Sequence, residues 1–287
     1  MTQGAGGRKR PALAPLRPRS MLFTLYGDYA YPSGRAIGLR AIVAMAARLG
    51  IGEVAVRSAI ARLARQGWLH AEKHGRRALY GLTDAGRRLI DEGTQRIYRP
   101  SSTKWTGSWC LLTYSIPESR RSLRDRMRRQ LAWLGFGAMG GGAYASPRAV
   151  SDEAQDLLRT HGVEPFARIF RAELRGSPGS DVDLVRACWD LASIGRRYRA
   201  FETHYAPLFA RDKRRLRAGQ LPDADAFVVR FALTHDFRRF PFIDPDLPRE
   251  LVPRGWPGFR ARSLFERYHA LLTDGAWRYF GSVADGD

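Results

Sequence analysis

The stretch "GIGEVAVRSAIARLARQGWLHAEKHGRRALYGLT", residues 50–83, decides how the first part of the chain folds. Val56, Ile60 and Leu63 recur at the spacing of one helix face, so we predict a helix from Glu53 to about Gln66. Gly67 follows at the position where a left-handed residue commonly ends a helix. The apolar row requires a small core on that side of the helix.

A β-hairpin is predicted after this helix. Residues 68–83 contain two strand-like runs on either side of a turn at His74–Gly75. Another amphipathic segment, residues 39–49, precedes the helix across a short glycine-containing break. Helices followed by a hairpin are the element order of a winged helix-turn-helix. We therefore predict such a DNA-binding domain over residues 19–98, ending in a helix at 84–99.

The other side of the predicted helix alternates small residues with arginines. One interpretation is a solvated surface that only keeps the helix soluble. The other is a recognition helix, because small residues allow close approach to the major groove and arginine pairs with guanine or phosphate. The preceding helix and the basic tip of the hairpin favour the second interpretation. The predicted DNA-binding residues are Arg57, Ser58, Arg62, Arg65, Lys73, His74, Arg76 and Arg77.

The charge of the chain points to the same partner. The formal net charge of the 287 residues is +20 at pH 7. Residues 1–100 hold 18 Lys and Arg against 6 acidic residues, whereas residues 176–287 hold 18 against 15. The excess of positive charge is thus concentrated around the predicted winged domain, which indicates a polyanion such as double-stranded DNA.

The rest of the chain divides by composition. Residues 1–18 are predicted to form a disordered basic tail, and residues 99–108 a linker. Strand and helix patterns alternate over residues 109–175, where the glycine-rich second strand could also be a pair of strands; this order fits a ferredoxin-like α/β sandwich. Residues 176–287 are predicted to form a helical domain. The expected fold class is α+β, and the C-terminal helices are expected at 183–205, 224–239 and 258–280.

Enzymatic motifs are missing from the sequence. It contains no GxxxxGK[ST], HExxH or GxSxG pattern, and the glycine-rich run at residues 137–143 lacks a helix and phosphate-handling residues directly after it, so we predict a non-enzyme without cofactor or metal. The alternative is a metal-dependent ribonuclease or RNA-processing protein built on the middle domain. The middle domain resembles the ferredoxin-like fold of CRISPR-adaptation endoribonucleases, which carry an acidic metal ligand at the end of the first strand. Here that strand ends "TYSIPES", residues 113–119, so the carboxylate is missing or displaced. Two distant cysteines and the lack of a long apolar run predict a cytoplasmic protein that does not bind membranes.

Four segments make the sequence resemble the PaaX family, repressors of phenylacetate degradation. The segments are "RSMLFTLYGDYAYPSG" at 19–34, residues 50–83, residues 105–147, and "HDFRRFPFIDPDLPRELVPRGWPG" at 235–258. The resemblance implies a homodimeric transcriptional repressor whose winged domain binds a palindromic operator. It also implies that the middle domain supports dimerisation, and that phenylacetyl-coenzyme A or a related aryl-acyl-coenzyme A is an effector that releases DNA.

The segment at 235–248 has two interpretations. It is either a structural cluster at a helix end or an anion-binding edge on an aromatic pocket, which would suit an acyl-coenzyme A. Under the second interpretation, aromatic residues of the helical domain join the basic ones. The predicted effector-binding residues are Trp189, Tyr205, His235, Arg238 and Arg239.

Overall fold

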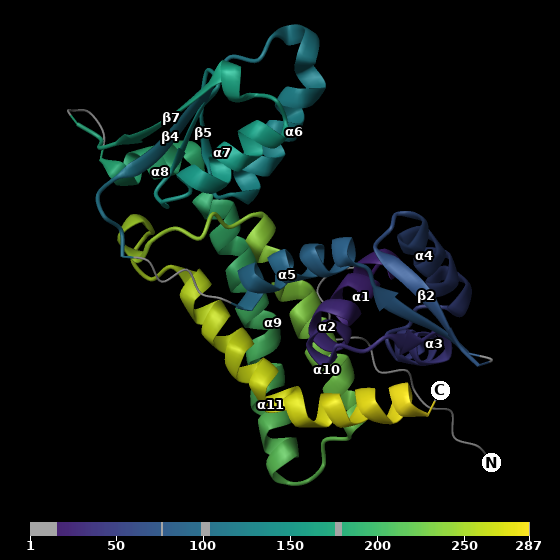
Figure 1. Ribbon diagram of the computed structural model, residues 1–287. Helices are drawn as coiled ribbons and strands as arrows, with labels where there is room; N and C mark the ends of the chain where they lie inside the picture. Colours follow the sequence, from purple (N-terminus) through teal and green to yellow (C-terminus); the bar gives the residue numbers. More distant parts are fainter. Residues whose placement is uncertain (1–15, 76, 99–103, 176–179, 287) are drawn as a thin grey trace. The chain divides into compact units, whose positions relative to one another are not determined.

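In the part of the chain that the structure describes, helices are combined with two antiparallel sheets, of three and four strands (Figure 1). The computed structural model describes residues 16–75, 77–98, 104–175 and 180–286. The α+β class expected from the sequence is confirmed. Residues 1–15 of the predicted tail and residues 99–103 of the predicted linker lie outside the described part of the chain.

Two compact units divide the chain, and both are discontinuous in sequence. The first unit comprises Met1–Arg99, Arg199–Arg238 and Phe259–Asp287. The second unit comprises Pro100–Tyr198 and Arg239–Gly258. The predicted helical domain at 176–287 therefore contributes segments to both units.

The N-terminal part of the first unit contains the predicted helices and hairpin, displaced by no more than a few residues. Its helix α1 starts at Pro18, because proline suits the first turn of a helix. A three-stranded sheet has the order β1-β3-β2, and its short strand β1 was not predicted. The elements are α1 (Pro18–Leu25), the π-helical turn η1 (Tyr26–Ala30), α2 (Tyr31–Ser33), β1 (Ile37–Gly38), α3 (Leu39–Arg48), α4 (Glu53–Arg65), β2 (Leu69–His74), β3 (Arg77–Leu82) and α5 (Asp84–Tyr98).

Three helices from the C-terminal part complete the first unit. They are α9 (Leu191–Arg217), which belongs to it from residue 199 onward, α10 (Asp223–Phe237) and α11 (Pro257–Asp285). Phe227 and Phe231 of α10 and Phe280 of α11 are buried in the same hydrophobic core as α1, α3 and α4. The ring of Tyr29 stacks on Phe280 with 5.2 Å between centroids. The N-terminal module and these helices thus share one core.

The single helix expected at 183–205 is interrupted at Trp189 and Asp190, so α8 (Asp181–Cys188) and α9 are separate helices, and α9 extends further than expected. The predicted end at residue 205 is wrong, because the helix continues through Pro207 to Arg217. A proline inside a helix removes one backbone hydrogen bond, which side-chain packing must offset. Tyr205 is fully buried in front of the proline, and its hydroxyl donates to Asp236 Oδ2 over 2.7 Å.

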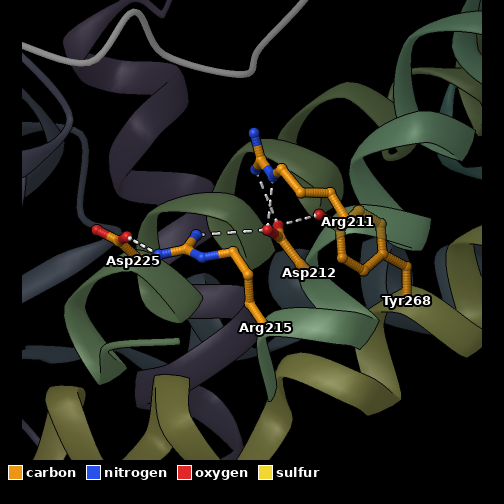
Figure 2. Close-up of polar contacts among 5 residues, drawn as sticks. All are labelled: Arg211, Asp212, Arg215, Asp225 and Tyr268. Atoms are coloured by element: carbon orange, nitrogen blue, oxygen red, sulfur yellow. Dashed lines mark hydrogen bonds and ion pairs between the residues drawn. The ribbon is translucent and has the colours of Figure 1, made fainter. Parts of the chain in front are cut away.

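A second polar cluster holds the part of α9 beyond the proline (Figure 2). The Asp212 side chain is completely buried and accepts hydrogen bonds from Tyr268 Oη at 2.6 Å and Arg211 Nε at 2.8 Å. Arg215 Nη2 reaches Asp225 Oδ2 at 3.1 Å. Burial raises the pKa of Asp212, but the bonds from Arg211 and Tyr268 outweigh it and hold the pKa below its usual value. The charged Asp212 carboxylate therefore links α9 to α11, and the Arg215 side chain links α9 to α10.

A buried ion pair joins the N-terminal module to α10. Asp28 Oδ2 of η1 lies 3.0 Å from Arg230 Nη1, and both side chains are only 4% exposed. Asp28 also accepts from Tyr98 Oη at 2.8 Å and Thr234 Oγ1 at 3.2 Å, and its Oδ1 lies 3.1 Å from His269 Nε2. Burial raises the pKa of Asp28, but the bond to His269 and the charge of Arg230 together hold it below its usual value. Asp28 is thus a charged group on which η1, α5, α10 and α11 converge.

The second unit is built around the four-stranded sheet. Two helices, α6 and α7, lie between strands along the chain, and Leu112, Met127, Leu131 and Leu158 are buried in its core. The sheet order is β5-β6-β4-β7, with every neighbouring pair antiparallel. The elements are β4 (Trp109–Tyr114), α6 (Arg121–Trp133), β5 (Gly137–Gly140), β6 (Ala143–Ser146), α7 (Ser151–Thr160), β7 (Ala167–Ala172) and α8 (Asp181–Cys188).

The glycine-rich segment is a pair of strands, the second of the two possibilities that the sequence leaves open. Gly140, Gly141 and Gly142 turn the chain between β5 and β6 with φ angles of 98°, 59° and 81°. A Cβ atom on Gly142 would lie 2.4 Å from the carbonyl oxygen of Tyr114. Glycine is required at this position both for its conformation and for the approach to β4.

Replacing Arg230 with methionine is expected to lower the free energy of unfolding of the first unit by about 3–5 kcal/mol, because Asp28 would stay buried without its cationic partner. Thermal and urea denaturation followed by tryptophan fluorescence would measure the change. Arg278→Met is the control, since Arg278 pairs with Asp223 at an exposed position and its loss should leave the midpoint almost unchanged. Equal effects of the two substitutions would contradict the assigned role of Asp28.

Candidate nucleic-acid interface

Helix α4 is anchored by one face. Val56, Ile60 and Leu63 are almost fully buried in the core of the first unit, as the apolar spacing predicts. Gly52 stands at the N-cap without a side-chain cap, and Gly67, with φ of 73°, ends the turn after the helix. Because the apolar row is fixed in the core, the opposite face is presented in a definite orientation.

The opposite face carries the predicted DNA-binding residues. Arg57, Ser58, Arg62 and Arg65 are all exposed, and the structure brings them together on this side of α4. A helix turns 100° per residue, so the row that points most directly away from the buried one contains Val54, Ser58, Ala61 and Arg65. Arg57 and Arg62 flank this row on its two sides.

Two features of this face were missed from the sequence. Val54, at the N-terminal end of the row, is 83% exposed. Arg57 is paired with Glu53 one turn earlier, with Nη2 and Oε1 2.7 Å apart. The i, i+4 spacing of Glu53 and Arg57 could have indicated the pair, whereas a valine on a basic surface carries no signal of its own. The pair restricts the Arg57 side chain, and both partners stay accessible to a ligand.

The hairpin β2–β3 follows α4 along the chain and carries the other predicted residues. Its strands pair antiparallel from Leu69 opposite Leu82 to His74 opposite Arg77. Lys73 and Arg77 lie near the tip and are exposed. Arg76 and the side chain of His74 lie outside what the structure describes.

The base of the hairpin is fixed to α5. Thr83 Oγ1 donates to the carbonyl oxygen of Gly67 over 2.6 Å, and Thr83 N donates to that of Trp68 over 3.2 Å. Gly86 of α5 packs so closely that a Cβ atom there would lie 2.2 Å from the Trp68 carbonyl oxygen. These contacts position the two strands relative to the end of α4.

The predicted effector-binding residues fall into two groups. Tyr205, His235 and Arg238 belong to the first unit, whereas Trp189 and Arg239 belong to the second. His235 Nδ1 lies 3.0 Å from Thr24 Oγ1, and Arg238 Nη2 donates to the carbonyl oxygen of Ser20 over 3.1 Å. The His235 and Arg238 contacts join the C-terminal end of α10 to α1.

Comparisons with known proteins point to the same family along most of the chain. The family model "PaaX-like protein" matches residues 17–86, "PaaX protein central Cas2-like domain" matches 102–185, and "PaaX-like protein C-terminal domain" matches 189–282. The "Transcriptional repressor PaaX" of Escherichia coli (strain K12) is 36% identical over 252 residues, covering 87% of this chain and 78% of that protein. The chain belongs to the PaaX family.

A solved structure supports the fold of this PaaX-family chain. The uncharacterized protein Rv0674 from Mycobacterium tuberculosis matches with a TM-score of 0.58 and 21% sequence identity. The match covers 93% of the present chain and 98% of the other. At this identity the likeness concerns the fold alone.

The PaaX-family segments do not coincide with the compact units. The C-terminal family model spans 189–282, and most of that span, residues 199–238 and 259–282, folds with the N-terminal family segment in the first unit. The exposed face of α4 is therefore carried by a unit that includes most of the C-terminal family segment.

The described residues of this PaaX-family chain lack the features of a metal site or a membrane span. No group of three or more His, Cys, Asp or Glu side chains in that part of the chain could hold a metal ion. The strand β4 ends at Tyr114, and Ser115 follows it, so no carboxylate stands at the strand end itself. Within the same residues, no helix is long and apolar enough to cross a bilayer.

Gly86→Ala is expected to destabilise the first unit and displace the hairpin, because the added methyl group would overlap the Trp68 carbonyl oxygen. Gly93→Ala is the matched control in the same helix, since nothing lies within 4 Å of its added Cβ. Alanine is the better helix former by about 1 kcal/mol, so this control should be neutral or stabilising. Thermal denaturation would compare them, and a Gly86→Ala protein as stable as the control would contradict this account.

Proposed function

We propose that this chain is a transcriptional repressor that binds double-stranded DNA through α4 and the hairpin β2–β3. The E. coli relative carries the name of a transcriptional repressor, and the relationship extends over most of both chains. That relationship supports a regulatory protein and not an enzyme. The observation that carries the proposal is the exposed face of α4, with Arg57, Ser58, Arg62 and Arg65 opposite a buried apolar row.

The N-terminal module acts in this proposal as a winged helix-turn-helix. The order α3, α4, β2, β3 supports it, because α4 would be the recognition helix and the hairpin would be the wing. Arg57, Ser58 and Arg62 would contact base edges, and Arg65 in the last turn would contact phosphate or solvent. Lys73, His74, Arg76 and Arg77 would bind the backbone or the minor groove beside α4.

A homodimer on a palindromic operator completes the DNA-binding part of the proposal. The strand–helix–strand–strand–helix–strand order and the sheet order β5-β6-β4-β7 support a ferredoxin-like second unit. Its strand β7 is at the edge of the described sheet, where Phe170 is half exposed, and an edge of this kind suits association with a second copy. A two-fold dimer would place two copies of α4 on symmetric half-sites.

The proposed effector is an aryl-acyl-coenzyme A such as phenylacetyl-coenzyme A. A ligand releases DNA only if it binds more tightly to the arrangement that cannot bind DNA. The contacts of His235 with Thr24 and of Arg238 with Ser20 provide a route for this effect, because they join α10 to α1. An effector that altered these contacts would act on the unit that carries α4. Trp189, Tyr205 and Arg239 stay candidates for the effector site.

Replacing Arg57 or Arg62 with alanine should lower affinity for the specific site by about ten- to a hundredfold each, the usual value of a bidentate base contact. The probe is a duplex selected by the wild-type protein from a random-sequence library, and fluorescence anisotropy would measure binding. Folding and oligomeric state should not change, because both side chains are exposed. Full retention of specific affinity would exclude α4 as the recognition helix.

Two variants separate specific from general effects in that experiment. Arg77→Ala in the wing should weaken binding to selected and unrelated duplexes alike. It should also reduce the slope of log affinity against log salt by about 0.9 for each phosphate that the variant no longer neutralises. Arg278→Ala removes an exposed arginine of α11 that pairs with Asp223, and should leave both affinities as in the wild type.

Phenylacetyl-coenzyme A is expected to raise the melting temperature of the protein and to displace the selected duplex, whereas free coenzyme A should do neither. A ligand that binds only the native state stabilises it by mass action, by about 2.7 kcal/mol at a hundredfold excess over its Kd. Thermal shift and anisotropy would be measured on the same preparation. Absence of both effects would exclude this class of effector.

A further inference from the structure

Val54 is the most exposed large hydrophobic residue in the described part of the chain, at 83%. It contributes little to the core, because almost all of its side chain faces solvent. As a β-branched residue it also lowers helix propensity relative to alanine. Neither folding nor helix stability therefore explains a valine at this position.

The place of Val54 in α4 provides an explanation. It is the second residue of the helix and begins the outermost row, which continues with Ser58, Ala61 and Arg65. Ser58 and Ala61 are small, so the helix can approach a surface closely along this row. Arg65 lies four residues after Ala61, at the C-terminal end of the helix.

The chemistry of the major groove identifies a partner for such a side chain. Base edges in the groove present hydrogen-bond donors and acceptors, and the only apolar group among them is the C5-methyl of thymine. The first residues of a recognition helix are the ones that reach base edges. Val54 has both the position and the apolar surface to contact that methyl group.

We propose that Val54 is a specificity-determining residue that packs against the C5-methyl of a thymine in each half-site. This inference rests on the proposed function, in which α4 enters the major groove. Arg57 and Arg62 on the two sides of the row supply polar contacts and charge, and Val54 supplies discrimination between thymine and the other bases. The Glu53–Arg57 ion pair lies on the flank next to Val54 and leaves the valine accessible.

A methyl-deletion cycle tests the proposal. Each thymine of the selected duplex is replaced in turn, symmetrically in both half-sites, by deoxyuridine, which lacks only the C5-methyl. Wild type and Val54→Ala are titrated against each duplex by fluorescence anisotropy. At one thymine position, the affinity of the wild type should fall about fourfold for each methyl group that is removed, one in each half-site. Val54→Ala should bind the thymine duplex more weakly by a similar factor and should not distinguish thymine from deoxyuridine there.

Leu89→Ala is the matched control, since Leu89 is another exposed apolar residue of the same unit, on α5. It should keep the wild-type response to every deoxyuridine substitution. Thermal denaturation would verify that Val54→Ala is folded, as an exposed position in a helix predicts.

Three results would overturn the inference. They are a selected site without a methyl-sensitive thymine, a methyl effect that is the same in Val54→Ala and wild type, and a Val54→Ala protein with unchanged affinity. If the wild type selected no sequence at all, the proposed function would fail together with the inference. If selection succeeded and depended on Arg57 and Arg62 but not on Val54, the proposed function would stand and only this inference would fail.

Discussion

The first unit depends on the buried contact between Asp28 and Arg230. Two opposite charges lie 3.0 Å apart with almost no exposure, in an otherwise apolar core. A buried ion pair adds little net stability compared with apolar residues of the same size, but it is costly to separate. A displacement of α10 along η1 would separate Arg230 from Asp28 and would also remove the contact of Thr234, which lies on the same helix. Our hypothesis is that the pair fixes the register of these two elements, which the surrounding aromatic contacts alone would specify less strictly.

This constraint changes how a signal could reach the proposed DNA-binding surface. If the N-terminal module were attached by a flexible linker alone, a ligand elsewhere in the chain could only change its average position. Here Tyr98 and His269 bring α5 and α11 to the same carboxylate, and α10 also contacts α1 through His235. A ligand that favoured another arrangement of α10 or α11 would therefore act directly on the core that holds α4. By reciprocity, DNA bound to α4 would change the affinity for that ligand by the same factor.

The sequence predicted local features well and long-range partnerships poorly. The apolar period of α4, its glycine ends and the hairpin after it depend on neighbours within a few residues, and they were all predicted. Asp28 could have been noticed as an acid within the apolar run 21–31, since a buried carboxylate needs partners. Arg230 could have been noticed in the same way, within the apolar run 226–233, but its pairing with Asp28 could not, because the two residues are far apart in the sequence.

Two other differences between the prediction and the structure have the same cause, which is that they depend on contacts between residues far apart in the sequence. The end of α9 was placed too early because Pro207 disfavours a helix locally, whereas the contacts of Tyr205 and Asp212 that offset it come from α10 and α11. The discontinuity of the compact units has no local signal either, since each segment by itself resembles part of a contiguous domain. Of the candidate site, the arginines followed from charge and spacing. The location of His235 and Arg238 against α1 required the fold.

The composition of the α4 face bears on how a very basic protein could be selective. A net charge of +20, concentrated toward the N-terminal end, favours any DNA, and this attraction does not depend on sequence. Additional arginines on α4 would strengthen binding to all sites and reduce the relative weight of the correct one. Discrimination must come from groups whose contribution disappears on the wrong base, such as a bidentate arginine at a guanine or an apolar side chain at a thymine methyl. The α4 face would meet this requirement, because Val54, Ser58 and Ala61 of its outermost row are uncharged and Arg57 and Arg62 lie on the two sides of that row. In the proposed complex the arginines would discriminate guanine, and Val54 would discriminate thymine.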